Sequence, residues 1–303
     1  MAWGIYIAVY LFLAGMGAGA FLTAAVAYVY SREGFRPLIR AGIVVGAPLV
    51  ALGMPFLLLD LGIGQREPWR IFWLYFGNTG SVMVWGTWII TFFIGVGLAN
   101  ILLELDIDWR ISLLKSLRAR LLPHRLLLLI AGSALAFATA TYTGLLLGMV
   151  VSVPLWNTPV LPLLFVVSAG STGMAAAVVT AVLFPMEERK LLAEHFFYLN
   201  QIHSLMIAVE MIFLFCYLFI IATTSIVGGQ SVGILLGGWL ALPFWVGVVL
   251  WGIVDPLLLY LYEVVLGKPM MPNAMLVSDT SVLLGGFVLR FVILSAALPI
   301  PLT

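Results

Sequence analysis

Long apolar stretches alternate with short polar loops along this chain. Eight such stretches occupy residues 4–30, 41–60, 81–104, 125–152, 159–185, 200–226, 233–263 and 274–298. A helix needs about 20 mainly apolar residues to cross the hydrocarbon core of a bilayer, and each stretch is long enough. Backbone that faces lipid must satisfy its hydrogen bonds internally, which a helix does. The pattern therefore predicts an all-α, polytopic membrane protein with eight transmembrane helices.

The distribution of Lys and Arg among the loops predicts the orientation of these helices. One alternating set of loops contains eleven of these residues, and the opposite set contains only Arg66 and Arg70. Loops that are rich in Lys and Arg stay on the cytoplasmic side of the membrane. We therefore expect both termini, and the loops at 61–80, 153–158 and 227–232, to lie outside.

The chain is expected to form one integral membrane domain, residues 1–303, with two four-helix bundles formed by residues 1–152 and 153–303. Hydrophobic residues make up 63% and charged residues 9%, which leaves no polar stretch for a soluble domain. The first stretch lacks a basic leader segment, so it is interpreted as a retained span and not as a cleaved signal. A net charge of +1 without a basic patch outside the short loops argues against a nucleic-acid partner.

The histidine and cysteine counts restrict the cofactors that this protein can hold. The single cysteine, Cys216, lies inside an apolar stretch, so any iron-sulfur cluster must belong to a partner. A di-haem cytochrome needs two pairs of histidines at bilayer depth, whereas only His203 lies within a span here, and His124 and His195 lie in or beside loops. The sequence therefore predicts no haem and no metal site.

Glycines and one basic segment have structural interpretations. Gly15, Gly17 and Gly19 in the first stretch, with Gly170 and Gly173 in the fifth, are typical of close helix packing in lipid. Residues 105–124 mix basic and apolar side chains, which predicts an interfacial helix.

Asp60 and the loop that follows it have two interpretations each. Asp60 stands where the second apolar stretch ends, so it is either a solvated carboxylate at a helix end or a proton-exchanging acid at the mouth of a pocket. Arg66, Trp69 and Arg70 follow in the same predicted outside loop. Their basic and aromatic side chains could dock a soluble partner or anchor the loop among lipid headgroups.

Tyr142 is unusually deep for a tyrosine in a membrane protein. It lies about ten residues before the outer end of the fourth stretch, which is about 15 Å by the helical rise. This depth is too great for the aromatic belt at the membrane surface. A buried phenol needs a hydrogen-bond partner, and either a backbone carbonyl or a quinone carbonyl could supply one.

Three sequence motifs of this chain resemble those of a known family. They are Tyr10-Leu11-Phe12-Leu13-Ala14-Gly15, Trp85-Gly86-Thr87-Trp88, and Tyr142-Thr143-Gly144 followed by Pro154-Leu155-Trp156-Asn157. In this order they resemble the NrfD/polysulfide reductase membrane-subunit family over about the first 180 residues. The resemblance implies a haem-free, quinone-reactive anchor in the plasma membrane of a prokaryote. Its expected partners are a four-cluster iron-sulfur protein and a molybdopterin catalytic subunit, and its expected cofactor is a quinone of the menaquinone type.

The resemblance also implies which residues contact the quinone near the outer face. Tyr142 corresponds to the family's tyrosine, and Asp60 to the acid of its second helix. Tyr10 occupies a polar position of the first helix where the best-known polysulfide enzyme has histidine. A phenol does not exchange protons near neutral pH as an imidazole does, so the hydrogen-bond chemistry at this position differs.

A second group of ionisable residues lies in the last three apolar stretches. His203 and Glu210 are seven residues apart, which places them on one helical face. Asp255, Asp279 and Arg290 lie in the seventh and eighth stretches. Because a lone buried arginine is costly, we expect Arg290 to pair with Glu210 or Asp255. The group is either a structural ion-pair network or a proton path from the inside.

Three functions follow from these patterns. The first is exchange of electrons and protons between the quinone pool and an iron-sulfur partner, for reduction of a sulfur compound such as polysulfide, sulfur, thiosulfate or tetrathionate. In this function Asp60 and Tyr142 are the catalytic residues. The second is a secondary transporter or ion-translocating subunit without a redox role, which predicts discontinuous helices in paired positions of the two halves. The third is a passive anchor.

Overall fold

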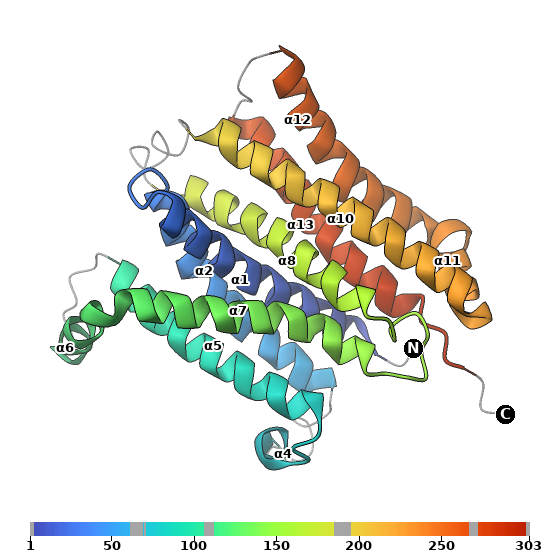
Figure 1. Ribbon diagram of the computed structural model, residues 1–303, viewed down its shortest axis with the longest axis horizontal. Helices are drawn as coiled ribbons and strands as arrows, with labels where there is room; N and C mark the ends of the chain where they lie inside the picture. The colour runs from blue at the N-terminus through green and yellow to red at the C-terminus, as the bar shows by residue number, and fades with distance from the viewer. Residues whose placement is uncertain are drawn as a thin grey trace.

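The computed structural model describes residues 3–60, 69, 71–105, 112–184, 195–266 and 272–300. The regular elements in these ranges are all helical (Figure 1). Eight helices in this part of the chain are long and apolar enough to cross a membrane. The predicted all-α class and the predicted number of spans are therefore confirmed.

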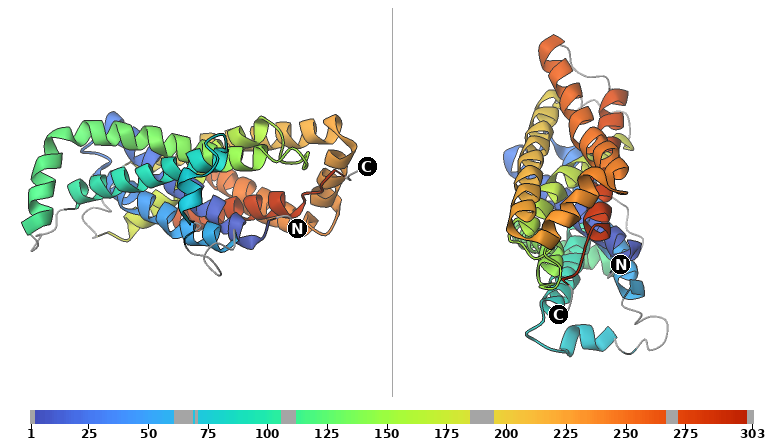
Figure 2. Two further views of the ribbon diagram at one scale, coloured as in Figure 1. Left: turned by 90° about the horizontal axis from the view of Figure 1, so that it is seen from below. Right: turned by 90° about the vertical axis from the view of Figure 1, so that its right-hand side faces the viewer.

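The first half of the sequence contributes four of these spans. They are α1 (Ile5–Tyr30), α2 (Arg36–Asp60), α5 (Val82–Glu104) and α7 (Arg125–Gly148). Between them lie the short helices α4 (Ile71–Phe76) and α6 (Ser112–Leu121), and the 3-10 turn η2 (Leu122–His124) joins α6 to α7. Helix α6 has no buried residue and turns across the end of the bundle (Figure 2). This arrangement fits the interfacial helix expected in 105–124, of which residues 106–111 lie outside the described ranges.

The second half contributes the other four spans, and one boundary differs from the expectation. The spans are α8 (Val160–Val182), α10 (Phe196–Thr224), the π-helix η3 (Pro243–Val254) continued by α12 (Asp255–Leu266), and α13 (Pro272–Ser295). Residues 227–232 were expected to form a loop, but they belong to a separate helix, α11 (Ile226–Gly237).

Local capping explains this difference. The extended backbone of Ser225 lets its hydroxyl accept a hydrogen bond from the backbone N–H of Gly228, which starts a new helix. The extended backbone of Gly238 ends that helix. The seventh span therefore begins at Pro243, ten residues later than the apolar pattern predicts.

Helices α1 and α8 form the centre of the molecule. Helix α1 packs against α2, α7, α8 and α13, and α8 also packs against α2, α7, α10 and α13. A Cβ on Gly19 would lie 1.7 Å from the carbonyl oxygen of Ala169, and a Cβ on Gly173 would lie 2.2 Å from the backbone nitrogen of Ala20. The two backbones thus touch through glycine, as the packing interpretation of these glycines predicts.

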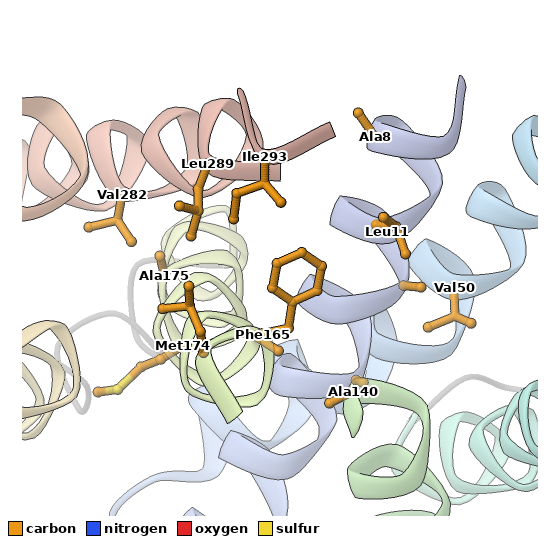
Figure 3. Close-up of a cluster of buried hydrophobic side chains, with 14 of the residues drawn as sticks. Ala8, Leu11, Val50, Ala140, Phe165, Met174, Ala175, Val282, Leu289 and Ile293 are labelled. Atoms are coloured by element: carbon orange, nitrogen blue, oxygen red, sulfur yellow. The ribbon is translucent and has the colours of Figure 1, made fainter. Parts of the chain in front are cut away.

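Larger side chains fill the space between α8, α1 and α13. Figure 3 shows the ring of Phe165, from α8, between Leu11 of α1 and the side chains of Leu289 and Ile293 of α13. All four residues are buried in one hydrophobic cluster. Packing in this cluster fixes the positions of α1, α8 and α13 relative to one another. The polar sites described below lie on these helices and their neighbours.

Both ends of the described polypeptide lie at the same end of the helices (Figures 1 and 2). The indole of Trp3 stacks on Trp156, with ring centroids 5.3 Å apart. The backbone N–H of Ile300 donates to the carbonyl of Ser152 over 2.8 Å. We call this end, with residues 3–4, 60, 148–159 and 296–300, the terminal end, and we call the opposite end, with Arg32, Arg36 and α6, the basic end. The positive-inside pattern predicts that the terminal end faces outside.

Candidate functional site

Tyr10 and Tyr142 lie together inside the first half of the molecule. Tyr10 lies five residues after the start of α1, and Tyr142 lies six residues before the end of α7. Both are therefore about 8–9 Å from the terminal end of their helices. For Tyr142 this is less than the predicted distance of about 15 Å, because α7 ends at Gly148 and not at residue 152. Tyr10 is fully buried and Tyr142 is 3% exposed. The resemblance predicted this proximity, and the two phenols are close enough to interact.

The hydroxyl of Tyr10 lacks a proper hydrogen bond. Although Tyr142 is near, no atom in the described part of the chain meets hydrogen-bond geometry at this oxygen. An unpaired buried hydroxyl costs about 1–3 kcal/mol, so few such groups persist without a reason. This hydroxyl is therefore available for a hydrogen bond to a ligand.

Two glycines of neighbouring helices face the tyrosines. A Cβ on Gly53 of α2 would lie 3.5 Å from Cδ2 of Tyr10, which is ordinary contact. A Cβ on Gly86 of α5 would lie only 1.9 Å from Cζ of Tyr142. The ring of Tyr142 therefore lies directly on the backbone of α5.

Asp60 lies at the terminal end of the molecule, on the helix that carries Gly53. It is the last residue of α2, seven residues beyond Gly53, and therefore on the same face of that helix about 10 Å further along. Its Oδ1 would lie 3.5 Å from a Cβ on Gly4, just before α1. The carboxylate is partly exposed at the helix end. Both interpretations of Asp60 remain compatible with this position.

The predicted docking loop is described only in part. Trp69 is 61% exposed, and it precedes α4, on which Phe72, Trp73 and Phe76 are also exposed. Arg66 and Arg70 lie outside the described residues.

A cavity of about 350 Å³ lies away from the tyrosines, between the segment 151–159 that precedes α8 and the C-terminal end of α10. Its lining includes Pro154, Asn157, Ile221 and Thr224, and neither Tyr10, Tyr142 nor Asp60. We rank the tyrosine pair above this cavity as the candidate site, because the pair contains a buried polar atom without a hydrogen-bond partner among the described residues, whereas the lining of the cavity contains none.

A second polar site crosses α13, α10 and α8. His203 Nδ1 lies 3.1 Å from Oδ1 of Asp279, and its Nε2 lies 3.1 Å from the carbonyl oxygen of Ser171. A carbonyl only accepts hydrogen bonds, so Nε2 carries a hydrogen. For Nδ1 and Oδ1 of Asp279 to form a hydrogen bond, a second proton must lie on either the imidazole or the carboxylate. The two side chains are thus placed to hold a proton between them, about 10 Å from the basic end of their helices.

Ser171 links this pair to Glu210. The Ser171 hydroxyl donates to Oε2 of Glu210 over 2.5 Å, and it also lies 3.1 Å from the carbonyl of Ser168. His203 and Glu210 therefore contact the same residue of α8, which confirms the prediction that they share one face of their helix. Both are at least 93% buried.

Arg290 ends this series of polar contacts beside α1. Its Nη1 donates to Ser168 Oγ over 3.1 Å and to the carbonyl of Gly286 over 2.7 Å. Its guanidinium carbon lies 5.8 Å from the ring centre of Phe12 and 5.3 Å from that of Phe165. Its Nε and Nη2 find no hydrogen-bond acceptor among the described residues.

The expected pairing of Arg290 with a carboxylate needs correction. Glu210 and Arg290 interact electrostatically, but Ser168 lies between them and contacts both. The guanidinium turns toward α1, where a Cβ on Gly15 would lie 2.9 Å from Nη2. Asp255 stands at the junction of η3 and α12, half-buried, and makes no ion pair or hydrogen bond with any described residue.

Sequence reasoning missed three residues that the structure places at these sites, namely Ser168, Ser171 and Gly86. The two serines are three residues apart in an apolar helix, a spacing that puts them on one face. That spacing was a usable signal, because polar side chains on one face of a membrane helix point into the bundle. Gly86 gave no signal beyond its place in the Trp85–Trp88 motif.

Comparison with known proteins gives a match along almost the full sequence. The model of the family described as "Polysulphide reductase, NrfD" matches residues 1–301. This chain belongs to the NrfD family. The motifs indicate the family over about the first 180 residues, and the family model matches well beyond them. Membership of this family also confirms that the chain is a multi-pass membrane protein.

Individual relatives agree with the family assignment. The chain is 30% identical to the protein NrfD of Escherichia coli over 98% of this chain and 95% of the relative. It is 29% identical to one of the chains of the polysulfide reductase of Wolinella succinogenes, over 86% of this chain and 83% of the relative. With one of the subunits of the selenate reductase of Mesobacillus selenatarsenatis it shares 25% identity over 57% of this chain and 46% of the relative.

Proposed function

We propose that this NrfD-family protein is the quinone-reactive membrane subunit of a respiratory reductase complex. It exchanges electrons and protons between a quinone pool, of the menaquinone type, and an iron-sulfur partner. The names of two relatives, which are parts of a polysulfide reductase and of a selenate reductase, support membership in a multi-subunit reductase. The single observation that carries the proposal is the buried, unpaired hydroxyl of Tyr10 beside Tyr142.

The tyrosine pair fits the carbonyl or hydroxyl oxygens of a quinone headgroup. Each phenol can donate one hydrogen bond and accept another, so Tyr10 and Tyr142 would orient the ring oxygens. A bound quinol supplies two electrons and two protons. Asp60, at the terminal end, would pass protons to water there. Because both phenols are closed off, binding requires neighbouring side chains to move.

The electron acceptor belongs to a partner at the terminal end. We propose a four-cluster iron-sulfur subunit there, with a molybdopterin subunit that reduces a sulfur compound such as polysulfide or tetrathionate. Arg66, Trp69 and Arg70 would contact the iron-sulfur subunit. Anchoring of Trp69 and the aromatic side chains of α4 among lipid headgroups is the competing role for that loop.

The second polar site would serve as a proton path from the basic end. Asp279 and His203 are placed to hold a proton between them, and Ser171, Glu210 and Ser168 continue the contacts to Arg290. The path ends against Gly15 of α1, about 8 Å along that helix from Tyr10. When the site reduces quinone, electrons arrive from the partner at the terminal end, and uptake of the two protons from the basic end would make turnover electrogenic. Asp255 has no place in this path, and a purely structural polar network is the competing interpretation.

The transporter alternative predicts paired helix breaks, which the described helices do not support. The seventh span contains the π-helix η3, whereas its counterpart in the first half, α5, is a regular α-helix from Val82 to Glu104. The passive anchor differs from our proposal in one measurable way: its tyrosines have no part in quinol turnover.

The test compares two electron donors in the purified complex. Tyr142→Phe should lower quinol-dependent reduction by about tenfold, because one hydrogen bond of about 1.5 kcal/mol is lost. Reduction driven by a reduced viologen dye, which delivers electrons to the partner subunits directly, should stay at the wild-type rate. Equal quinol activity in both proteins would support the passive anchor and contradict the proposal.

A further inference from the structure

Gly86 makes an unusual contact among the glycines of the spans. The three atoms closest to a Cβ at this position are Cζ, Cε2 and Cε1 of Tyr142, at 1.9, 2.0 and 2.5 Å. Cζ is the carbon that carries the hydroxyl. The space that the absent side chain leaves is therefore filled by the reactive end of one phenol ring.

Two other buried glycines, Gly144 and Gly19, serve the packing of whole helices. A Cβ on Gly144 would meet the backbone of Pro162 at 2.4 Å, and a Cβ on Gly19 would meet the backbone of Ala169. At those positions a methyl group would push two backbones apart. At Gly86 it would push aside a side chain, because none of the three nearest atoms is backbone.

We infer that Gly86 is a positioning residue for Tyr142, and that the absence of its side chain sets where the phenol hydroxyl meets the quinone. The inference rests on the proposed function, since it assigns Tyr142 to the quinone. A methyl group at position 86 must rotate the ring or shift it along α5, because real Cβ atoms do not approach another heavy atom within 3.0 Å. Displacement of the hydroxyl by an ångström or more breaks a hydrogen bond, whose geometry tolerates only a few tenths.

The experiment measures the affinity of a quinol-site inhibitor, heptyl-hydroxyquinoline N-oxide, by quenching of its fluorescence. Gly86→Ala should weaken binding by about tenfold, which is the loss of one hydrogen bond. Tyr142→Phe should weaken binding by a similar factor. The double variant should be no weaker than Tyr142→Phe alone, because the hydroxyl that Gly86 positions is already gone.

A glycine away from the tyrosine pair provides a matched control. Gly95 lies on the same helix, α5, and a Cβ there would meet nothing within 4 Å, so Gly95→Ala should bind as wild type.

The outcomes separate this inference from the proposed function. Losses that multiply to about a hundredfold in the double variant would show that Gly86→Ala acts through α5 as a whole, which overturns the inference. Wild-type affinity in Gly86→Ala would overturn it as well. Absence of saturable binding in the folded wild-type protein would instead overturn the proposed function.

A folding defect in Gly86→Ala is itself informative. Gly86→Ala/Tyr142→Ala removes the ring that the methyl would strike, so this double variant should accumulate in the membrane as well as Tyr142→Ala does. A double variant that fails to accumulate would show that the methyl clashes with something other than the ring and would overturn the inference.

Discussion

Tyr10 and Tyr217 are both fully buried, but their hydroxyl groups differ in hydrogen bonding. Tyr217 donates to the carbonyl of Leu155 over 2.6 Å, whereas Tyr10 has no partner of hydrogen-bond geometry in the described part of the chain. Tyr217→Phe should therefore lower the free energy of unfolding by about 1–3 kcal/mol, because it leaves a buried carbonyl unpaired. Tyr10→Phe should leave thermal stability in detergent unchanged or raise it.

The same pair distinguishes function from stability. Tyr10→Phe should lower quinol turnover despite its intact fold, and Tyr217→Phe should not change turnover at a temperature where it remains folded. Destabilisation by Tyr10→Phe as large as that by Tyr217→Phe would contradict our description of the Tyr10 hydroxyl as unpaired.

Glu210 offers a second prediction at the residue scale. Glu210→Gln can keep a hydrogen bond to Ser171 but cannot release a proton, so vesicles that contain the complex should develop little or no membrane potential during quinone reduction driven through the partner subunits. A voltage-sensitive dye measures this potential. The comparison variant is Glu263→Gln, since Glu263 is also buried but contacts Asn200, which is not one of the residues of the proposed path. A wild-type dye response in Glu210→Gln would support the structural interpretation.

The sequence predicts how far along its helix each polar residue lies better than it predicts which neighbouring helix the side chain faces. Spacing along the helix places His203 and Glu210 on one face, and the family motif brings Tyr10 and Tyr142 together, as the structure confirms. The partner of Arg290 was not predictable, because depth in the membrane does not fix the rotation of a helix about its axis. Asp255 lies at a suitable distance along its span, yet the structure gives it no contact with Arg290.

At the scale of elements, backbone contact between α1 and α8 determines the architecture. Gly19→Ala would place a methyl 1.7 Å from the carbonyl oxygen of Ala169, so the two helices would have to separate. Overpacking of this kind costs about 1–3 kcal/mol, and we expect a clear fall in the melting temperature of the detergent-solubilised protein.

The control for this prediction is Gly233→Ala in α11, where a Cβ would meet nothing within 4 Å. An alanine there should be neutral or slightly stabilising, since alanine favours a helix by about 1 kcal/mol over glycine. Equal melting temperatures for Gly19→Ala and wild type would show that α1 and α8 do not depend on this contact.

Hydrophobic pattern predicts the existence of the spans but not the start of the seventh. Residues 226–237 are as apolar as a span, so composition alone does not separate α11 from the helix that follows. The separation depends on capping by Ser225 and on the extended backbone of Gly238, which are local features that a count of apolar residues does not register.

At the scale of the whole molecule, the two ends differ in charge, and this difference bears on partner binding. Arg66→Ala/Arg70→Ala, at the end predicted to face outside, should weaken retention of the iron-sulfur subunit. The loss should be larger at low salt, because about 1 M salt already screens such contacts in the wild type. Co-purification at low and high salt measures it.

Lys115→Ala/Arg120→Ala provides the control for charge removal. These residues are exposed on α6 at the basic end, so their loss should leave retention of the iron-sulfur subunit unchanged. Equal retention by the Arg66/Arg70 variant at every salt concentration would favour lipid anchoring as the role of that loop.

The most direct test of quinone binding at the tyrosine pair is a titration of heptyl-hydroxyquinoline N-oxide into purified wild-type and Tyr142→Phe protein. We expect saturable quenching with one inhibitor per protein molecule in the wild type, and about tenfold weaker binding in the variant. Equal affinity in both proteins would place the inhibitor elsewhere, for example in the cavity between α8 and α10, and would contradict the assignment of Tyr142. No saturable binding to the folded wild-type protein would contradict the quinone-reactive function itself.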